Sequence, residues 1–136
     1  MAFEIHERER EGITILDVAG RLIVGQTSGA LRERIQQAIA AGKRNLVLNL
    51  AGVDYIDSTG LGTMVMCFRF TQTAGGALKL LKLNRRELEL LVLTKLTTVF
   101  DIYNEEQDAL NSFYPDREIK KFDILSFIKQ TQEDGM

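Results

Sequence analysis

Ser58, within the stretch Ile-Asp-Ser-Thr-Gly-Leu-Gly at residues 56–62, is the side chain best placed to do chemistry. The sequence predicts a buried strand over residues 45–50, then a polar turn, then a helix that begins at Thr59 or Gly60. Ser58 is therefore expected at an exposed strand-to-helix junction, where free backbone N–H groups and the helix dipole favour an anion. A phosphate on Ser58 would be tolerated there and would change the surface charge. This chemistry is that of a switch rather than of a catalytic centre.

An enzyme nucleophile is the competing interpretation of Ser58, and the sequence argues against it. Ile56 occupies the position of the first glycine in the Gly-x-Ser-x-Gly pattern of hydrolases. His6 is the only histidine, and it lies far from Ser58 in the sequence, on a predicted edge strand. We therefore predict no catalytic residue. A simpler alternative also stands, because Asp57, Ser58 and Thr59 are residue types that cap helices.

Composition excludes several function classes. The chain has 136 residues, with 17 basic and 19 acidic side chains and a formal charge of −2, so no nucleic-acid or membrane surface is predicted. Cys67 is the only cysteine, which excludes an internal disulfide and a cysteine-based metal site, and we expect neither a metal nor a cofactor. The charged N-terminal segment and the absence of a long apolar run predict a cytoplasmic protein.

Strand and helix patterns alternate along the chain. A turn at Glu11-Gly12 predicts a hairpin of the first two strands, and Ser28 or Thr27 is predicted to cap the first helix. Crossovers through helices imply an α/β fold with a mixed, mostly parallel sheet packed with about four helices. The predicted strands cover residues 3–7, 13–19, 45–50, 77–83 and 99–102, and the predicted helices residues 27–41, 59–74, 86–93 and 105–113.

Pro115 marks the predicted boundary between a domain at residues 1–114 and a C-terminal extension at residues 115–136. A short helix in the extension would carry an apolar stripe of Phe122, Leu125 and Ile128, widened by Ile124 and Phe127. That stripe predicts either a tail helix docked on its own domain or a contact with a partner, such as a homodimer. Residues 131–136 are expected to be disordered.

Three stretches of this sequence resemble the STAS domain, the fold of anti-sigma factor antagonists and of the cytoplasmic tails of sulfate transporters. The resemblance covers about residues 3–113, and its most specific part is the stretch around Ser58. The three stretches are Val-Ala-Gly-Arg-Leu at 18–22, residues 48–62, and residues 96–103 followed by Glu105, Glu106, Ala109 and Leu110.

The resemblance implies a function and a set of site residues. In stand-alone members, the serine after the aspartate of this motif is phosphorylated by an anti-sigma factor that is also a serine kinase. The unphosphorylated antagonist binds that kinase and frees the sigma factor, and a serine phosphatase resets it. Here the implied acceptor is Ser58, and the implied partner-binding residues are Asp57, Thr59, Gly60, Leu61, Gly62, Gln26 and Thr27. Gly60 and Gly62 match small residues of the family, where the backbone of a partner is expected to approach closely.

One departure from the family keeps an alternative open. Family members often carry an acidic residue soon after the Gly-x-Leu of the second strand, and residues 20–25 hold none. Gln26 or Thr27 could take part of that role. The alternative is a STAS adaptor module in a signalling assembly or a lipid or small-molecule transport assembly, without a phosphorylation switch.

Overall fold

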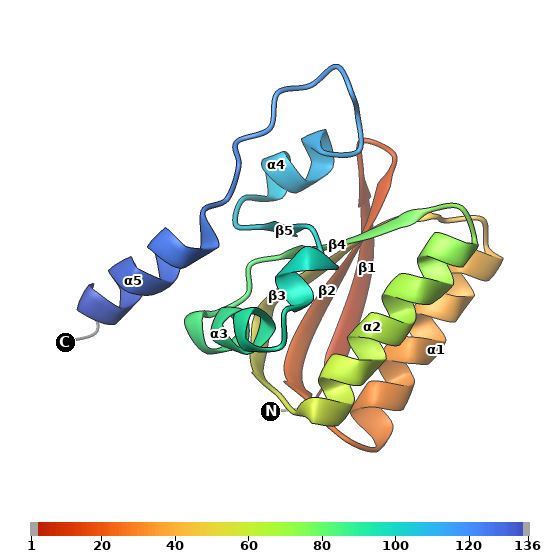
Figure 1. The fold of residues 1–136 in the computed structure, drawn as a ribbon. Helices are drawn as coiled ribbons and strands as arrows, with labels where there is room; N and C mark the ends of the chain where they lie inside the picture. The colour runs from red at the N-terminus through yellow and green to blue at the C-terminus, as the bar shows by residue number, and fades with distance from the viewer. Residues whose placement is uncertain (1–2, 135–136) are drawn as a thin grey trace.

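The computed structural model describes residues 3–134, and the side chains of residues 3–130. Its sheet has the strand order β1-β2-β3-β4-β5, with β1 antiparallel to β2 and every other neighbouring pair parallel (Figure 1). This confirms the predicted mixed sheet with an N-terminal hairpin. The elements are β1 (Glu4–Arg10), β2 (Ile13–Leu22), α1 (Gln26–Ala40), β3 (Asn45–Ile56), α2 (Ser58–Thr73), β4 (Ala77–Leu81), α3 (Arg85–Leu93), a 3-10 turn (Leu96–Thr98), β5 (Ile102–Tyr103), α4 (Glu106–Asn111) and α5 (Ile124–Asp134).

Side chains on both faces of the sheet are buried, because helices cover both. Successive residues of a strand point to opposite faces, so Leu16 and Val18 of β2 enter one core while Ile13 and Ile15 enter the other. The larger core receives α1, α2 and α3, and α1 and α2 lie side by side across the sheet (Figure 1). The smaller core receives Leu110 and its neighbours on α4. The site is thus built on a sheet held from two sides.

The largest difference from the sequence prediction is the length of β3, which continues to Ile56 instead of ending at residue 50. The second half of β3 pairs with β2 alone, since the β3–β4 pairing ends at Asn49. Val53 and Ile56 are buried in this second half, and their burial fixes the direction in which β3 continues beyond β4. β3 therefore extends past the end of β4 and delivers Ser58 to the tip of the extended β2–β3 pair.

Other boundaries shift for local reasons. The predicted strand at residues 99–102 is wrong in position, because residues 96–98 form a 3-10 turn and only Ile102 and Tyr103 pair with β4. Helix α1 is not capped by Thr27 or Ser28, because it begins at Gln26 with Gly25 as the N-cap residue. Gly25 has φ = 100°, a backbone conformation that favours glycine.

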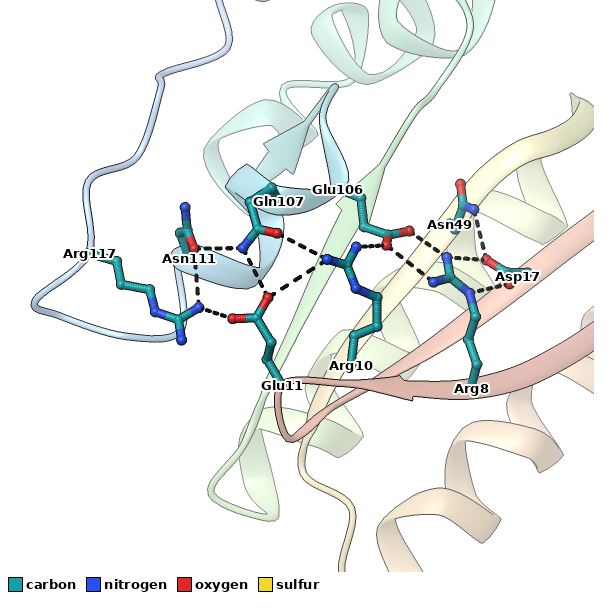
Figure 2. A network of polar contacts seen from close by, with 9 residues as sticks. All are labelled: Arg8, Arg10, Glu11, Asp17, Asn49, Glu106, Gln107, Asn111 and Arg117. Atoms are coloured by element: carbon teal, nitrogen blue, oxygen red, sulfur yellow. Dashed lines mark hydrogen bonds and ion pairs between the residues drawn. The ribbon is translucent and has the colours of Figure 1, made fainter.

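A network of charged side chains fastens α4 to the β1–β2 hairpin (Figure 2). The Arg8 guanidinium makes a bidentate contact with Asp17, at 2.6 and 3.1 Å, and also pairs with Glu106 at the start of α4. Arg10 pairs with the same Glu106 carboxylate. The hydrogen bonds from Arg8 and Arg10 lower the pKa of Glu106 to about 2. Each of these carboxylates is engaged by arginine, so the network is a structural clamp.

The C-terminal helix docks on its own domain. Phe122, Ile124, Phe127 and Ile128 pack against the larger core, and α5 contacts α3. Leu125 does not belong to this buried set, because 68% of it is exposed. Residues 131–134 continue α5, so the predicted disorder is wrong for them, while residues 135 and 136 lie outside the described residues.

Candidate functional site

Ser58 is exposed at the strand-to-helix junction, as the sequence predicts, but α2 begins at Ser58 itself and not at Thr59 or Gly60. Asp57, which precedes it, is the N-cap of the helix, and its Oδ1 accepts a hydrogen bond of 2.7 Å from the Gly60 N–H. The Leu61 N–H donates to the Asp57 carbonyl at 2.9 Å, which closes the first turn. The Ser58 hydroxyl is therefore presented to solvent from a rigid helix end.

The second carboxylate oxygen of Asp57 joins the site to the start of α1. Its Oδ2 accepts a hydrogen bond of 3.0 Å from the Val24 N–H, in the loop between β2 and α1. The hydrogen bonds from Gly60 and Val24 hold the pKa of Asp57 below its usual range, and the charge of Arg21 adds to this effect. Asp57 thus holds together the first turn of α2, which contains Ser58, and the loop between β2 and α1.

The capped helix end changes one expectation about phosphate. Free backbone N–H groups at this helix end were expected to favour an anion, and one of them, the Gly60 N–H, is already bound by the Asp57 carboxylate. A phosphate on Ser58 would compete with that carboxylate for the helix end. The charge of a phosphorylated Ser58 is therefore directed outward, toward whatever docks on this surface.

Two of the predicted partner-binding residues have an internal role. Gly60 is buried, and a Cβ atom at this position would lie 2.2 Å from the Leu22 carbonyl oxygen. The small residue is required by the chain itself, so the expected close approach of a partner backbone at Gly60 is not needed to explain it. Leu61 is 9% exposed and packs in the larger core. Gly62, by contrast, is exposed, and a Cβ there would meet nothing within 4 Å.

The structure brings the start of α1 next to Ser58 and shows what each side chain does there. Gln26 is exposed, whereas the Thr27 hydroxyl is committed to the Ile23 backbone, from whose N–H it accepts and to whose carbonyl it donates. Val24 is 66% exposed and was not among the predicted residues. Thr59, next to Ser58, is exposed. The bond from Val24 to Asp57 joins the two segments, and we call their exposed or half-buried residues Val24, Gln26, Asp57, Thr59 and Gly62 the Ser58 surface.

Neither the single histidine nor the single cysteine belongs to this surface. His6 is on β1, where its ring Nε2 lies 3.4 Å from the Glu4 carboxylate Oε2. Cys67 is buried in α2, and burial raises the pKa of its thiol to about 12, which makes it unreactive. Among the side chains of residues 3–130, no group of three metal-ligating residues comes together. In the same part of the chain, no helix is both long and apolar enough to cross a membrane.

The sequence profile of the STAS domain matches residues 4–109, which is most of the chain. The chain belongs to the STAS domain family. The matched segment of this STAS domain runs from β1 into α4, so α5 lies beyond it.

Similar proteins agree in sequence and in fold. This STAS domain is 32% identical over 102 residues to an anti-sigma-B factor antagonist of Bacillus subtilis, an alignment that covers 75% of this chain and 92% of the relative. Among solved structures, it resembles an anti-sigma factor antagonist from Mycobacterium paratuberculosis, with a TM-score of 0.70 and 20% identity, covering 82% of this chain and 93% of that one. It also resembles the Bacillus cell fate determinant SpoIIAA in the phosphorylated form, with a TM-score of 0.63 and 18% identity. This match covers 82% of this chain and 99% of that one.

We expect Asp57→Ala to destabilise the STAS domain, because it removes both the helix cap and the link to Val24. Asp57→Asn should retain most of the stability, since asparagine also caps helices. The Asp57 pKa is lowered on folding, so its stabilisation is present above its unfolded pKa and is lost as the pH falls. Urea unfolding midpoints at pH 7 test this. Ser58→Ala is the control and should leave the midpoint unchanged, and an unchanged midpoint for Asp57→Ala would contradict the assignment.

Glu87, on α3, is a buried carboxylic acid near the end of β3, and the sequence analysis missed it. It is 3% exposed, and burial raises its pKa to about 7; the hydrogen bond from the Asn84 backbone opposes that shift and the charge of Asp54 adds to it. The apolar pattern at residues 86–93 predicts that Glu87 lies on a helix but does not predict that it is buried. Its burial depends on packing against residues that are distant in the sequence.

We expect the stability to fall as the pH rises past Glu87's unfolded pKa toward its folded one. A raised pKa means that the folded state binds the proton more tightly, so deprotonation at higher pH costs folding free energy. Glu87→Gln removes this titration, so its free energy of unfolding should not show this fall. Relative to the parent protein, the free energy of unfolding of the variant should rise by roughly 2–3 kcal/mol between pH 4.5 and pH 8. Urea unfolding at both pH values measures it. A difference independent of pH would show that Glu87 titrates normally.

Proposed function

We propose that this protein is an anti-sigma factor antagonist whose binding is switched off by phosphorylation of Ser58. The observation that carries the proposal is the presentation of Ser58: it is exposed on the first turn of a rigidly capped helix, at the tip of the β2–β3 pair. The antagonist names of the relatives support the same function. In this role the protein is a binding protein of the cytoplasm rather than an enzyme.

The proposed partner is an anti-sigma factor with serine kinase activity. In the unphosphorylated state, the Ser58 surface binds the kinase, which then releases its sigma factor. Gln26, Thr59 and Gly62 are the exposed positions through which such a partner would contact the domain beside Ser58. Transfer of the phosphoryl group from ATP to the Ser58 hydroxyl forms the phosphoserine and leaves ADP on the kinase.

Electrostatics explains why the product would dissociate. Phosphorylation adds roughly 1.5 to 2 negative charges at pH 7, next to the Asp57 carboxylate and close in sequence to Asp54. The new charge would face the phosphates of the nucleotide that remains on the kinase. The Gly60 N–H cannot neutralise it, because Asp57 already occupies that donor. A serine phosphatase would then restore the binding state.

Reconstitution with purified proteins tests the proposed function. The protein is added to a complex of sigma factor and candidate anti-sigma kinase from the same organism, and free sigma factor is measured by native mass spectrometry. We expect stoichiometric release of sigma factor by the unphosphorylated protein and none by protein that has been fully phosphorylated beforehand. Failure to bind any serine-kinase anti-sigma factor of that organism would overturn the proposal.

One observation favours the alternative of an adaptor module in a signalling or transport assembly. Residues 20–25 lack an acidic side chain, and the apolar Val24 is 66% exposed in the loop between β2 and α1. A surface of this kind suits an apolar contact that does not depend on Ser58. An adaptor would bind its partner equally well with Ser58→Ala and Ser58→Asp, whereas an antagonist would lose affinity only with the aspartate.

A further inference from the structure

A hollow of about 310 Å³ opens between the end of β3 and α3. Its walls include Ile56 from β3 and Leu90 and Leu93 from α3, together with the Tyr55 ring. The hollow adjoins the Ser58 surface, because the β3 residues that line it lead directly through Asp57 to Ser58. Nothing in the mechanism proposed above uses it.

Glu87 lies at this hollow with one carboxylate oxygen unused. Its Oε1 accepts a hydrogen bond of 3.1 Å from the Asn84 N–H, and the Glu87 N–H donates to Asn84 Oδ1 at 2.8 Å, which forms a capping box. Its Oε2 is buried and accepts no hydrogen bond from any described residue. A buried polar atom without a partner is unfavourable, so it requires an explanation.

The helix cap does not explain the carboxylate. Glutamine caps the same position through its side-chain oxygen and carries no charge into the interior. Glu87 is only 3% exposed, and burying its carboxylate is less favourable than burying the neutral amide that could form the same cap. Its second oxygen is the part that capping leaves unexplained, and a hydrogen-bond donor from outside the chain would satisfy it.

Charge and shape at the hollow indicate which donor fits. Asp54, Glu87 and Glu89 contribute carboxylates and Arg86 a guanidinium, and Glu89 is paired with Arg85 at 3.8 Å. Asp54 and Glu87 are therefore the carboxylates of this lining that no described basic side chain pairs with. Leu93 is 80% exposed at the edge, next to an apolar wall. An aliphatic stem that ends in a cationic donor matches both features, because the stem can cover the apolar wall while the cation meets the acid.

We propose that this hollow receives a lysine or arginine side chain of the protein that docks on the Ser58 surface, with the cationic group bound by Glu87. The inference rests on the proposed function and adds to it an anchor outside the Ser58 surface.

The first arm of the test uses a probe and no partner. Butylguanidinium is titrated into the ¹⁵N-labelled protein at pH 8, with butanol as the neutral probe of the same stem. We expect saturable amide shifts at Tyr55, Glu87 and Leu90 with butylguanidinium alone. Glu87→Gln should weaken that binding by about tenfold or more, and Glu89→Gln, which removes a less buried carboxylate of the same hollow, by less than about threefold. Equal loss in both variants, or equal binding of butanol, would overturn the proposal.

The second arm measures the affinity of the anti-sigma kinase for the parent protein, Glu87→Gln and Glu89→Gln. We expect Glu87→Gln to weaken the complex by about tenfold or more and Glu89→Gln by less than about threefold. If the kinase binds the parent and Glu87→Gln equally well, the anchor is wrong while the antagonist function stands. If no kinase binds the parent, the proposed function fails, and with it the assignment of the hollow to a kinase side chain, even where the probe binds. Unfolding curves of both variants confirm that they are folded at pH 8.

Discussion

Phosphorylated Ser58 is expected to bind the anti-sigma kinase at least about 100-fold more weakly than the unphosphorylated protein, a loss of about 2.7 kcal/mol. Ser58→Ala should bind within about threefold of the parent, because the hydroxyl is exposed and no capping bond depends on it. Ser58→Asp should lie between them, since aspartate supplies one charge rather than nearly two. Isothermal titration calorimetry with the three proteins and the phosphorylated form measures the series.

The expected loss of affinity is large because the site does little to neutralise the added phosphate charge. The Gly60 N–H at this helix end is bound by Asp57, and the charge of Arg21 is already attracted to that same carboxylate. The added charge is therefore poorly compensated within the domain. A complete switch from 99% bound to 1% bound requires about 5.5 kcal/mol, which repulsion and desolvation at the interface would have to supply together. Equal affinity of the phosphorylated and unphosphorylated forms would contradict the switch.

Gly60→Ala is expected to destabilise the domain by about 1–3 kcal/mol, a large effect for one added methyl group. The added methyl group would lie 2.2 Å from the backbone oxygen of Leu22, where neither partner is a flexible side-chain end. To relieve the clash, α2 must move away from β2, and Ser58 moves with it. Urea unfolding measures the loss, and a change below about 0.5 kcal/mol would show that the helix end can shift freely.

Gly62→Ala is the matched control, two residues along the same helix. A methyl group there meets nothing within 4 Å, and alanine favours a helix over glycine, so this variant should be more stable by about 0.5–1 kcal/mol. Because the variant stays folded, it also tests the partner surface. We expect it to weaken kinase binding, since Gly62 is exposed beside Ser58 and was predicted to allow a close approach. Unchanged affinity would remove Gly62 from the interface.

Local patterns in the sequence were sufficient for the elements with strong periodicity. Leu31, Ile35 and Ala38 recur at helical spacing, and all three are buried in α1. The second half of β3 was missed because Gly52, Asp54 and Tyr55 give no alternating apolar pattern. Those residues form a strand because they pair with β2, and a pairing between distant segments is not visible in a local pattern.

In the candidate site, too, features formed by contiguous residues could be predicted, whereas contacts between residues distant in the sequence could not. Ser58 and its cap Asp57 could be predicted because the strand, the turn and the helix are contiguous in the sequence. The hydrogen bond from Val24 to Asp57 joins residues 33 positions apart, and the pairing of Arg8 with Glu106 joins residues 98 apart. No residue pattern predicts such contacts. They appear only once the sheet order is known.

Mass spectrometry after incubation with ATP and the candidate anti-sigma kinases tests the central claim most directly. Intact mass gives the number of phosphates and peptide mapping gives their position, with Ser58→Ala treated in parallel. We predict a single phosphate on Ser58 that is absent from the alanine variant. A phosphate on Thr59 instead, or no phosphate on a protein that binds the kinase tightly, would contradict the account and leave Ser58 as part of a capped helix end.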